Sequence, residues 1–247
     1  MKVSLIARTR FNDELAEDLT GFVADTLGTD AGNLAEFAGR ACYDSFNKPN
    51  PATRDNADYL AHIFEIEHES VVEHGTCSFY IEGVSRALTH ELVRHRHHSY
   101  SQLSQRFVKL GPGVTYVTPP LFEDNDEAAY VLQQAWEMAC NSYEALVMIG
   151  ERTITQRSLE PTKARKRVRE AARAVLPNMT PTAIVVSGNH RSWREFLISR
   201  GSLSADAEIR RLAVTIYLWL SEVEPNLYQD MHVAKDEDGE QYVGLVV

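Results

Sequence analysis

Alternating and helical spacings of hydrophobic residues divide the chain into short predicted strands and longer predicted helices. Segments that alternate, or that are rich in β-branched and aromatic residues, are predicted to be strands: Lys2–Ala7, Thr76–Ile81, Val114–Val117, Thr182–Ser187 and part of the tail His232–Val247. Segments with helical spacing or helix-capping residues are predicted to be helices: Asn33–Tyr43, one after Thr53, Ser85–Val93, Asp126–Glu151, Lys163–Val175, Ser192–Arg200 and one after Ser204. Because strands and helices mix without a regular βαβ order, we expect an α+β fold. It would be a single domain over residues 1–247, with a mixed or antiparallel sheet flanked by long helices.

The longest predicted helix has the clearest periodicity. Within Asp126–Glu151, apolar residues recur at spacings of four, four, three and four, at Leu132, Trp136, Cys140, Tyr143 and Val147. This spacing is typical of one helix face packed against a core. Capping and breaking residues predict other helix ends: N-caps at Thr53 and Ser204, Pro177 after the basic helix, and Gly201 at the C′ position after Arg200.

Composition indicates a globular protein of the cytoplasm. Hydrophobic residues make up 44% of the 247 residues, which is ample for a core. No apolar run approaches the roughly 20 residues that span a bilayer, and the N-terminal segment reads as a first strand, not a secretory signal. The three cysteines, Cys42, Cys77 and Cys140, are odd in number and far apart. We therefore expect no disulfide framework, and we expect each cysteine to be a small buried hydrophobe.

The charge is negative overall but has two cationic stretches. The net charge is -10, which argues against general nucleic-acid binding, since that depends on neutralising many phosphates. Between Arg86 and Lys109 there are five Arg or Lys residues against one acid, Glu91, and between Lys163 and Arg173 there are six against Glu170. Two local cationic stretches in an acidic protein favour a confined anionic ligand.

The segment from Arg94 to Arg106, RHRHHSYSQLSQR, has the highest density of side chains that could bind a ligand. Arg offers a planar donor fork that matches phosphate oxygens in pairs, and Ser and Gln add neutral hydrogen-bonding groups. A surface helix would normally carry Glu among its Arg residues, and this segment has none. No dinucleotide-binding G-x-G-x-x-G motif follows a strand and no P-loop is present, so side chains and irregular loops would have to hold any nucleotide.

Two other functions are compatible with this cluster. One is a non-catalytic RNA- or nucleotide-binding module, against which the overall acidity argues. The other is a metal-dependent hydrolase that uses the histidines. His90 and His95 are five residues apart, about 140° around a helix, whereas zincin helices need a spacing of four. Neighbouring Arg residues would also repel a divalent ion, so we predict no metal ligands.

The same segment closely resembles the signature of the flavin-dependent thymidylate synthase family. That signature is Arg-His-Arg, seven residues and then Ser, which fits Arg94-His95-Arg96 and Ser104 without a gap. The continuation Gln105-Arg106 also fits. Further matching stretches extend the resemblance over most of the chain: His68–His74, Ala172–Pro177, Asn189–Trp193 and Phe196–Arg200.

The resemblance implies reductive methylation of dUMP to dTMP. In that family, 5,10-methylenetetrahydrofolate supplies the carbon, and FAD reduced by NADPH supplies the reducing equivalents. The family works as a homotetramer whose sites are built from more than one subunit. For this chain the expected partners are therefore the small-molecule substrate dUMP and other copies of itself, with no nucleic acid and no membrane.

The resemblance also implies roles for individual residues. Contacts to FAD are expected from Ser70, Arg94, His95, Arg96, Gln102, Asn189, His190 and Arg191. Contacts to dUMP are expected from Glu91, Leu92, Val93, Arg94, Gln102, Leu103, Ser104, Gln105, Arg106, Arg173 and Arg200. Arg200 is the catalytic candidate, because it resembles the residue that helps to ionise N3 of the uracil.

Physical chemistry supports the role of Arg200 and leaves alternatives open elsewhere. A fixed cation beside a developing anion lowers the pKa of that group and activates the ring. Taken alone, Arg200 could equally be a basic residue that complements the C-terminal end of the helix dipole. Arg173 could lie on a solvated helix face, and Ser70 could be a turn or capping residue. Glu195 stands where family members often have Asn or His, so it is not assigned to the site.

Overall fold

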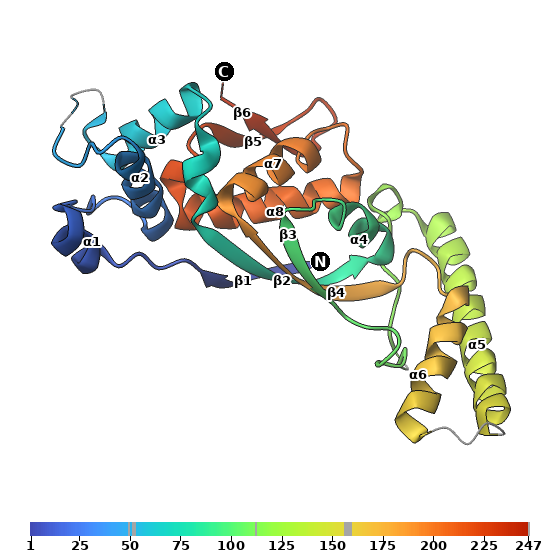
Figure 1. Ribbon diagram of the computed structural model, residues 1–247. Coiled ribbons are helices and arrows are strands. Elements are labelled where there is room, and N and C mark those ends of the chain that lie inside the picture. The colour runs from blue at the N-terminus through green and yellow to red at the C-terminus, as the bar shows by residue number, and fades with distance from the viewer. Residues whose placement is uncertain (49, 51–52, 112, 156–159, 247) are drawn as a thin grey trace. The chain divides into compact units, whose positions relative to one another are not determined.

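A four-stranded sheet in the order β1-β2-β4-β3 is formed by β1 (Lys2–Arg8), β2 (Thr76–Ser85), β4 (Pro181–Asn189) and β3 (His98–Gln102) (Figure 1). The computed structural model describes residues 1–48, 50, 53–111, 113–155 and 160–246. The backbone of Thr9 bonds to Thr76 just past the end of β1, and Lys2 at its start pairs with Glu82. These two contacts show that β1 runs antiparallel to β2.

The remaining pairs of this sheet are also antiparallel. Ser78 and Ser187 are hydrogen-bonded through their hydroxyls at 2.7 Å, whereas the Arg86 N–H donates to the Thr180 carbonyl beyond the opposite ends of the same two strands. Along β4, every second residue is buried, including Ile184 and Val186, as a strand with one covered face requires. The predicted α+β fold with an antiparallel sheet is confirmed.

Contacts divide the chain into two compact units. The first comprises Met1–Lys2, Ile81–Leu92 and Ser101–Ile184, and the second comprises Val3–Tyr80, Val93–Tyr100 and Val185–Val247. The helices of the first unit are α4 (Arg86–Leu92), α5 (Asp126–Thr155) and α6 (Pro161–Ala172). Helices α5 and α6 lie side by side (Figure 1) around a core of Tyr143, Val147, Val168 and Ala172. The predicted apolar stripe of α5 is therefore confirmed at Tyr143 and Val147.

The second unit holds the other helices and a C-terminal hairpin. Its helices are α1 (Asp13–Thr20), α2 (Asp30–Cys42), α3 (Asn56–Glu65), α7 (His190–Arg200) and α8 (Ala207–Val223). The hairpin pairs β5 (Met231–Lys235) with β6 (Gln241–Leu245) in antiparallel register, Met231 opposite Leu245. Helices α7 and α8 bury Trp193, Phe196, Ile209 and Leu212 completely or almost completely.

Several predicted boundaries were wrong by a few residues. The N-cap of α3 is Asp55, whose carboxylate accepts the Asp58 N–H, instead of Thr53. Helix α8 begins after Asp206 instead of Ser204, whose hydroxyl is bonded to that of Ser202. Helix α6 ends at Ala172 and continues as a 3-10 turn to Val175.

Two further sequence predictions were wrong. Val114–Val117 is not a strand: the Val114 N–H donates to the Gly111 carbonyl at 3.5 Å, and the Val117 N–H donates to the Met179 carbonyl at 2.9 Å. The strand predicted in the tail is confirmed, and it pairs with a second strand to form the hairpin. Of the cysteines, only Cys77 is buried as predicted; Cys42 is exposed and Cys140 is partly exposed. Within the described chain, no helix combines the length and the apolar character that crossing a membrane demands.

Candidate active site

The first signature arginines bound a cavity of about 550 Å³ in the second unit. After α4 the chain turns, and the Tyr100 hydroxyl donates to the His95 carbonyl at 2.7 Å, which fixes the turn. The cavity is lined by Arg94, His95, Arg96, His97 and His98 from this turn, and by Ser192, Glu195, Ser199 and Arg200 from α7. Three arginines and one carboxylate, that of Glu195, therefore line this cavity.

Arg200 and His95 both line this cavity and contact each other. The Arg200 Nε donates to Nε2 of His95 at 3.1 Å. Since a guanidinium has no acceptor, this His95 nitrogen must be unprotonated, which assigns the ring proton to Nδ1. Burial lowers the pKa of His95, with Arg200 and Arg94 adding to the effect and Glu195 opposing it. The cavity thus holds a neutral imidazole directly beside a permanent cation.

His98 also lines the cavity and is 7% exposed. Its ring lies 4.4 Å from Trp193, and neither ring nitrogen has a hydrogen-bond partner among the described residues. A Cβ on Gly188 would lie 2.4 Å from the His98 ring, so only glycine permits this approach. Burial lowers the pKa of His98 to about 4, and His95 and His97 contribute. His98 is therefore neutral and packs as an aromatic ring.

This burial predicts an acid-sensitive fold. The folded pKa of His98 lies below its ordinary value of 6.5, so its contribution to stability is full above pH 6.5 and is lost as the pH falls towards 4. The loss between pH 7 and pH 4.5 should be about 2 kcal/mol. In the variant His98→Phe, the free energy of unfolding, measured in urea, should fall by that much less than in the wild type. Equal losses in both proteins would contradict the prediction.

A second cavity of about 260 Å³ lies at the N-terminus of α7. Asn189 is the N-cap, and its side chain accepts the Ser192 N–H at 2.8 Å. Asn189 and Arg191 line the cavity, and Arg191 pairs with Glu73 across it. It shares His97, Ser192 and Glu195 with the first cavity. A helix N-terminus with a nearby guanidinium favours an anionic group such as phosphate.

The side chains of His190 and Ser70 line none of the cavities described here. The His190 ring is fully buried, with Nδ1 2.9 Å from the Tyr228 hydroxyl and Nε2 3.8 Å from the Cys77 sulfur. Burial lowers its pKa to about 4; because the ring is fully buried, only the backbone of His190 remains available to a ligand. Ser70 is exposed on the 3-10 helix Glu69–Glu73 and lines none of the cavities described here.

The second half of the signature lies in the first unit, against α4. The Gln102 side-chain amide donates to the hydroxyls of Thr89 at 3.0 Å and Thr182 at 3.4 Å. This brings two of the predicted substrate segments together, the end of α4 and the loop that follows Gln102. Leu92 is fully buried, so its side chain cannot touch a ligand and only its backbone remains available. Glu91 is half-buried and Val93 is exposed.

The loop from Leu103 to Val108 is held against α6 by charged side chains. Arg106 pairs with Glu170 at 2.6 Å, and Arg169 donates to the Phe107 carbonyl. Lys166 lies 4.8 Å above the Phe107 ring. Arg106 was expected to be a substrate residue, and the structure adds a carboxylate partner that orients it.

Arg173 has a cationic neighbour that the sequence reasoning missed. It lies half-buried in the turn after α6. Burial lowers the pKa of Arg86, and the charge of Arg173 lowers it further. Two guanidinium groups that repel each other are typical of an anion site. The signal was present in the sequence, since Arg86 opens the first cationic stretch.

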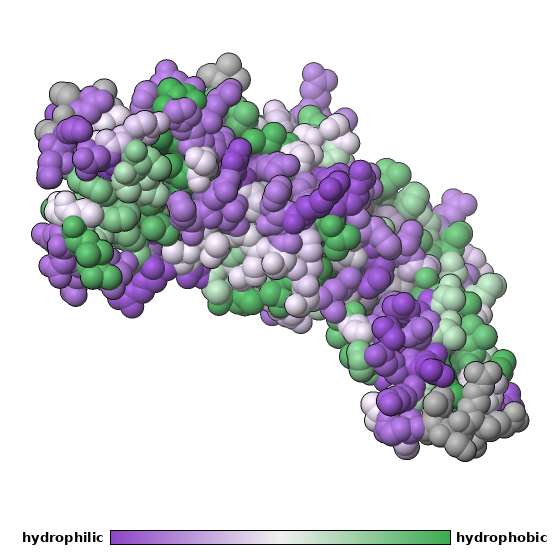
Figure 2. Space-filling view, viewed as in Figure 1, coloured by the Kyte–Doolittle hydropathy of each residue, from purple (hydrophilic) through white to green (hydrophobic). Residues whose placement is uncertain are grey.

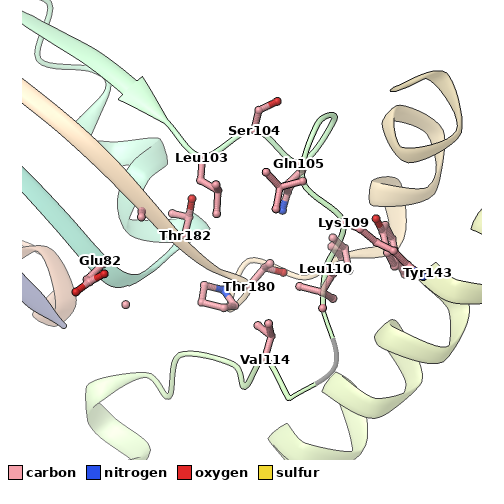
Figure 3. Close-up of a pocket in the computed structure, with 16 residues that line it drawn as sticks. Glu82, Leu103, Ser104, Gln105, Lys109, Leu110, Val114, Tyr143, Thr180 and Thr182 are labelled. Carbon is pink, nitrogen blue, oxygen red and sulfur yellow. The ribbon is translucent and has the colours of Figure 1, made fainter. Parts of the chain in front are cut away.

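A third cavity, of about 260 Å³, lies behind the loop (Figure 3). Leu103, Ser104 and Gln105 form one wall, and Val114, Tyr143, Thr180 and Thr182 line the rest. The Ser104 hydroxyl accepts the Arg106 N–H at 3.3 Å, which suits a positioning hydroxyl. None of the three cysteines lines any of the three cavities.

Comparisons with known proteins agree with the resemblance. Residues 23–226 match the model of the family described as thymidylate synthase complementing protein. The chain is 47% identical over 242 residues to a flavin-dependent thymidylate synthase of Mycobacterium marinum, covering 98% of this chain and 94% of the relative. It is 46% identical over 239 residues to the enzyme of that name from Mycobacterium tuberculosis, covering 97% and 93%. The chain therefore belongs to the thymidylate synthase complementing protein family.

Proposed function

We propose that this chain is a flavin-dependent thymidylate synthase, which methylates dUMP to dTMP reductively. Its carbon donor is 5,10-methylenetetrahydrofolate, and its reductant is FAD that NADPH has reduced. Family membership and identities of 46–47% to enzymes of this name support the proposal. The structural observation that carries it is the pair of Arg200 and neutral His95 in a cavity bounded by Arg94 and Arg96.

The residues present suit FAD. Arg94 and Arg96 line the larger cavity, and Asn189 and Arg191 line the smaller one at the start of α7. Together these groups would hold the pyrophosphate and the hydroxyl groups of a dinucleotide, because donor forks and a helix N-terminus both favour phosphate. When bound, the flavin supplies the reducing equivalents of the reaction. Ser70 and Gln102 remain proposed contacts from the resemblance alone.

The proposed dUMP site uses the loop and the arginines of the first unit. Arg106 and Arg173 would bind the phosphate, with Arg86 beside Arg173. The end of α4, at Glu91–Val93, and the loop residues Gln102–Gln105 would position the nucleoside.

Arg200 would act on the uracil ring. Its guanidinium is a permanent donor with a fixed charge, so it would lower the pKa of uracil N3 and stabilise the ionised ring. Burial raises the pKa of the Cys77 thiol to about 12, which removes its nucleophilic thiolate at neutral pH. This agrees with a mechanism that needs no enzyme thiol, in contrast to the classical thymidylate synthase, which attacks the uracil ring with a thiol.

We also propose that the protein assembles as a homotetramer. Helix α5 carries a second apolar face, since Val131, Met138 and Ile149 are 60%, 70% and 49% exposed and fall on one side of the helix. Figure 2 shows hydrophobic side chains along this helix. The spacing Val131, Ala135, Met138, Ser142, Ala145, Ile149 alternates between four and three, as in helices that pack in pairs. Light scattering should give a mass four times that of the chain; a monomer would reject this proposal.

The proposed domain extends over residues 1–247, and the proposed compartment is the cytoplasm. The relatives align over 97–98% of the chain, which supports treating it as one functional domain. The three cysteines are free, as is usual in a reducing compartment.

Anaerobic turnover tests the function directly. The purified protein should be yellow, with flavin absorbance, and should form dTMP from dUMP only when methylenetetrahydrofolate, NADPH and FAD are all present. Tight nucleotide binding without any turnover would favour a binding module instead. Activity that disappears with a chelator would favour a metal-dependent hydrolase.

Removing the Arg106 side chain should weaken dUMP binding. Arg106→Ala should raise the Kd for dUMP about tenfold to 100-fold, because charge-assisted hydrogen bonds to phosphate are worth about 1.5–3 kcal/mol. Affinity for FAD should stay unchanged, and isothermal titration calorimetry measures both. Arg165→Ala is the matched control, because Arg165 is an exposed residue of α6 that donates to the Thr162 hydroxyl. An unchanged Kd for dUMP in Arg106→Ala would refute the phosphate assignment.

A further inference from the structure

The C-terminal hairpin packs directly against the residue that follows Arg200. The Val243 N–H in β6 donates to the Gly201 carbonyl at 2.9 Å. A Cβ on Gly201 would lie 2.4 Å from the Leu197 carbonyl oxygen and 2.7 Å from the Val243 Cβ. Gly201 is the C-cap of α7 instead of the predicted C′ residue, and its backbone is right-handed, with φ -79°. Glycine is needed here for space, because the hairpin lies so close to the end of α7.

A buried arginine joins the segment after Arg200 to the turn of the hairpin. Arg210 in α8 is 7% exposed. Its Nη1 donates to the carbonyls of Leu203 at 3.1 Å and Ala205 at 3.4 Å, and its Nη2 donates to the Glu240 carboxylate at 2.9 Å. One guanidinium thus fixes residues 203–205 and Glu240 together. A buried charge of this kind needs its counter-charge, because desolvation is costly without it.

The base of the hairpin is anchored as well. The Tyr217 hydroxyl of α8 donates to the Met231 carbonyl at 2.6 Å. Arg194 of α7 forms a double hydrogen bond with Asp230, at 2.8 Å and 2.6 Å. The residue before the hairpin is therefore bonded to α7 near its middle, and the hairpin itself bonds to the residue that follows Arg200, the last residue of α7 (Figure 1).

We propose that the hairpin Met231–Leu245, through Gly201 and the Arg210–Glu240 pair, is a positioning element that holds the Arg200 guanidinium against His95. The hairpin lies outside residues 23–226, the part matched by the family model. Arg200 has a long side chain, and its reach to His95 depends on where the end of α7 is held. A misplacement of about 1 Å at a reacting group can cost roughly 100-fold in rate. The catalytic part of this inference rests on the proposed function, whereas the structural part does not.

The test measures the position of Arg200 without requiring turnover. In Glu240→Gln, the loosened segment should let the Arg200 cation move away from His95. The pKa of His95, followed by NMR on the folded full-length protein labelled at histidine, should then rise towards its ordinary value, because Arg200 lowers it in the wild type. Arg200→Ala gives the full rise for comparison. The exposed neighbour Glu237 provides the control: Glu237→Gln makes the same charge change on the same turn and should leave the pKa unchanged.

Kinetics then separate positioning from general damage. Glu240→Gln should lower kcat about tenfold while the Kd values for FAD and dUMP stay within twofold. Gly201→Ala should act in the same direction, because its Cβ would displace the end of α7. If the pKa of His95 in Glu240→Gln equals that of the wild type, or if Glu237→Gln changes it equally, the hairpin does not position Arg200. If the wild type forms no dTMP, the proposed function fails, yet the NMR result still decides whether the hairpin holds Arg200.

Discussion

Replacing Arg200 with alanine should lower dTMP formation by about 100-fold to 1000-fold. Removing one preorganised group that stabilises developing charge typically costs this much. Arg200 is half-buried, lines the larger cavity and donates to a neutral His95, so it offers its charge where bulk water screens it less. FAD should remain bound, because Arg94, Arg96 and the start of α7 are untouched. Single-turnover kinetics and flavin absorbance measure the two effects.

Two comparisons make this prediction sharper. Arg200→Lys keeps the charge but loses the planar fork, so its rate should lie between those of the wild type and Arg200→Ala. The pH dependence of the rate should shift as well, because the uracil N3 would ionise at higher pH without the cation. Wild-type turnover in Arg200→Ala would remove the role assigned to Arg200 altogether.

Elements with strong hydrophobic periodicity could be predicted from the sequence. The stripe of α5 and the β-branched run of β4 specify their own structure, because burial of a regular apolar face stabilises it locally. Strand β3, His98–Gln102, has no such pattern and was not predicted. Its geometry depends on pairing with β4, which lies about 80 residues away, and no local signal reports that pairing. Likewise, Val114–Val117 has strand-like composition but finds no partner strand among the described residues.

The site was predicted in its residue types and only partly in its contacts. The resemblance named both Arg200 and His95, yet their hydrogen bond joins positions 105 apart, which residue types alone do not reveal. The resemblance of Asn189-His190-Arg191 to a FAD-binding stretch also named His190. The interior position of its ring is decided by Tyr228 and Cys77, which are remote in sequence. Arg106 shows the same limit. Its partner Glu170 lies in the stretch Lys163–Arg173, which was interpreted only as cationic, so the ion pair between them was not predicted.

Arg194 is a buried arginine that the sequence analysis did not single out. It lies between the matching stretches Asn189–Trp193 and Phe196–Arg200, is 2% exposed and points into the second unit. Its guanidinium packs 3.8 Å from the centre of the Phe64 ring and donates to the Leu227 carbonyl. It also donates two hydrogen bonds to the Asp230 carboxylate. A cation with so little water around it depends on Asp230, since Glu69 is 3.9 Å away.

Asp230→Ala should therefore lower the free energy of unfolding by about 3–5 kcal/mol, the usual cost of leaving a buried charge without its partner. Urea denaturation followed by circular dichroism measures it. Asp238→Ala, at an exposed position of the hairpin turn, should change stability by less than about 0.5 kcal/mol. The double variant Arg194→Met with Asp230→Ala should lose less than the sum of the two single variants, because the unpaired cation is gone. A strictly additive double variant would mean that Arg194 stabilises the fold through Phe64 and Leu227, and that Asp230 is dispensable as its counter-charge.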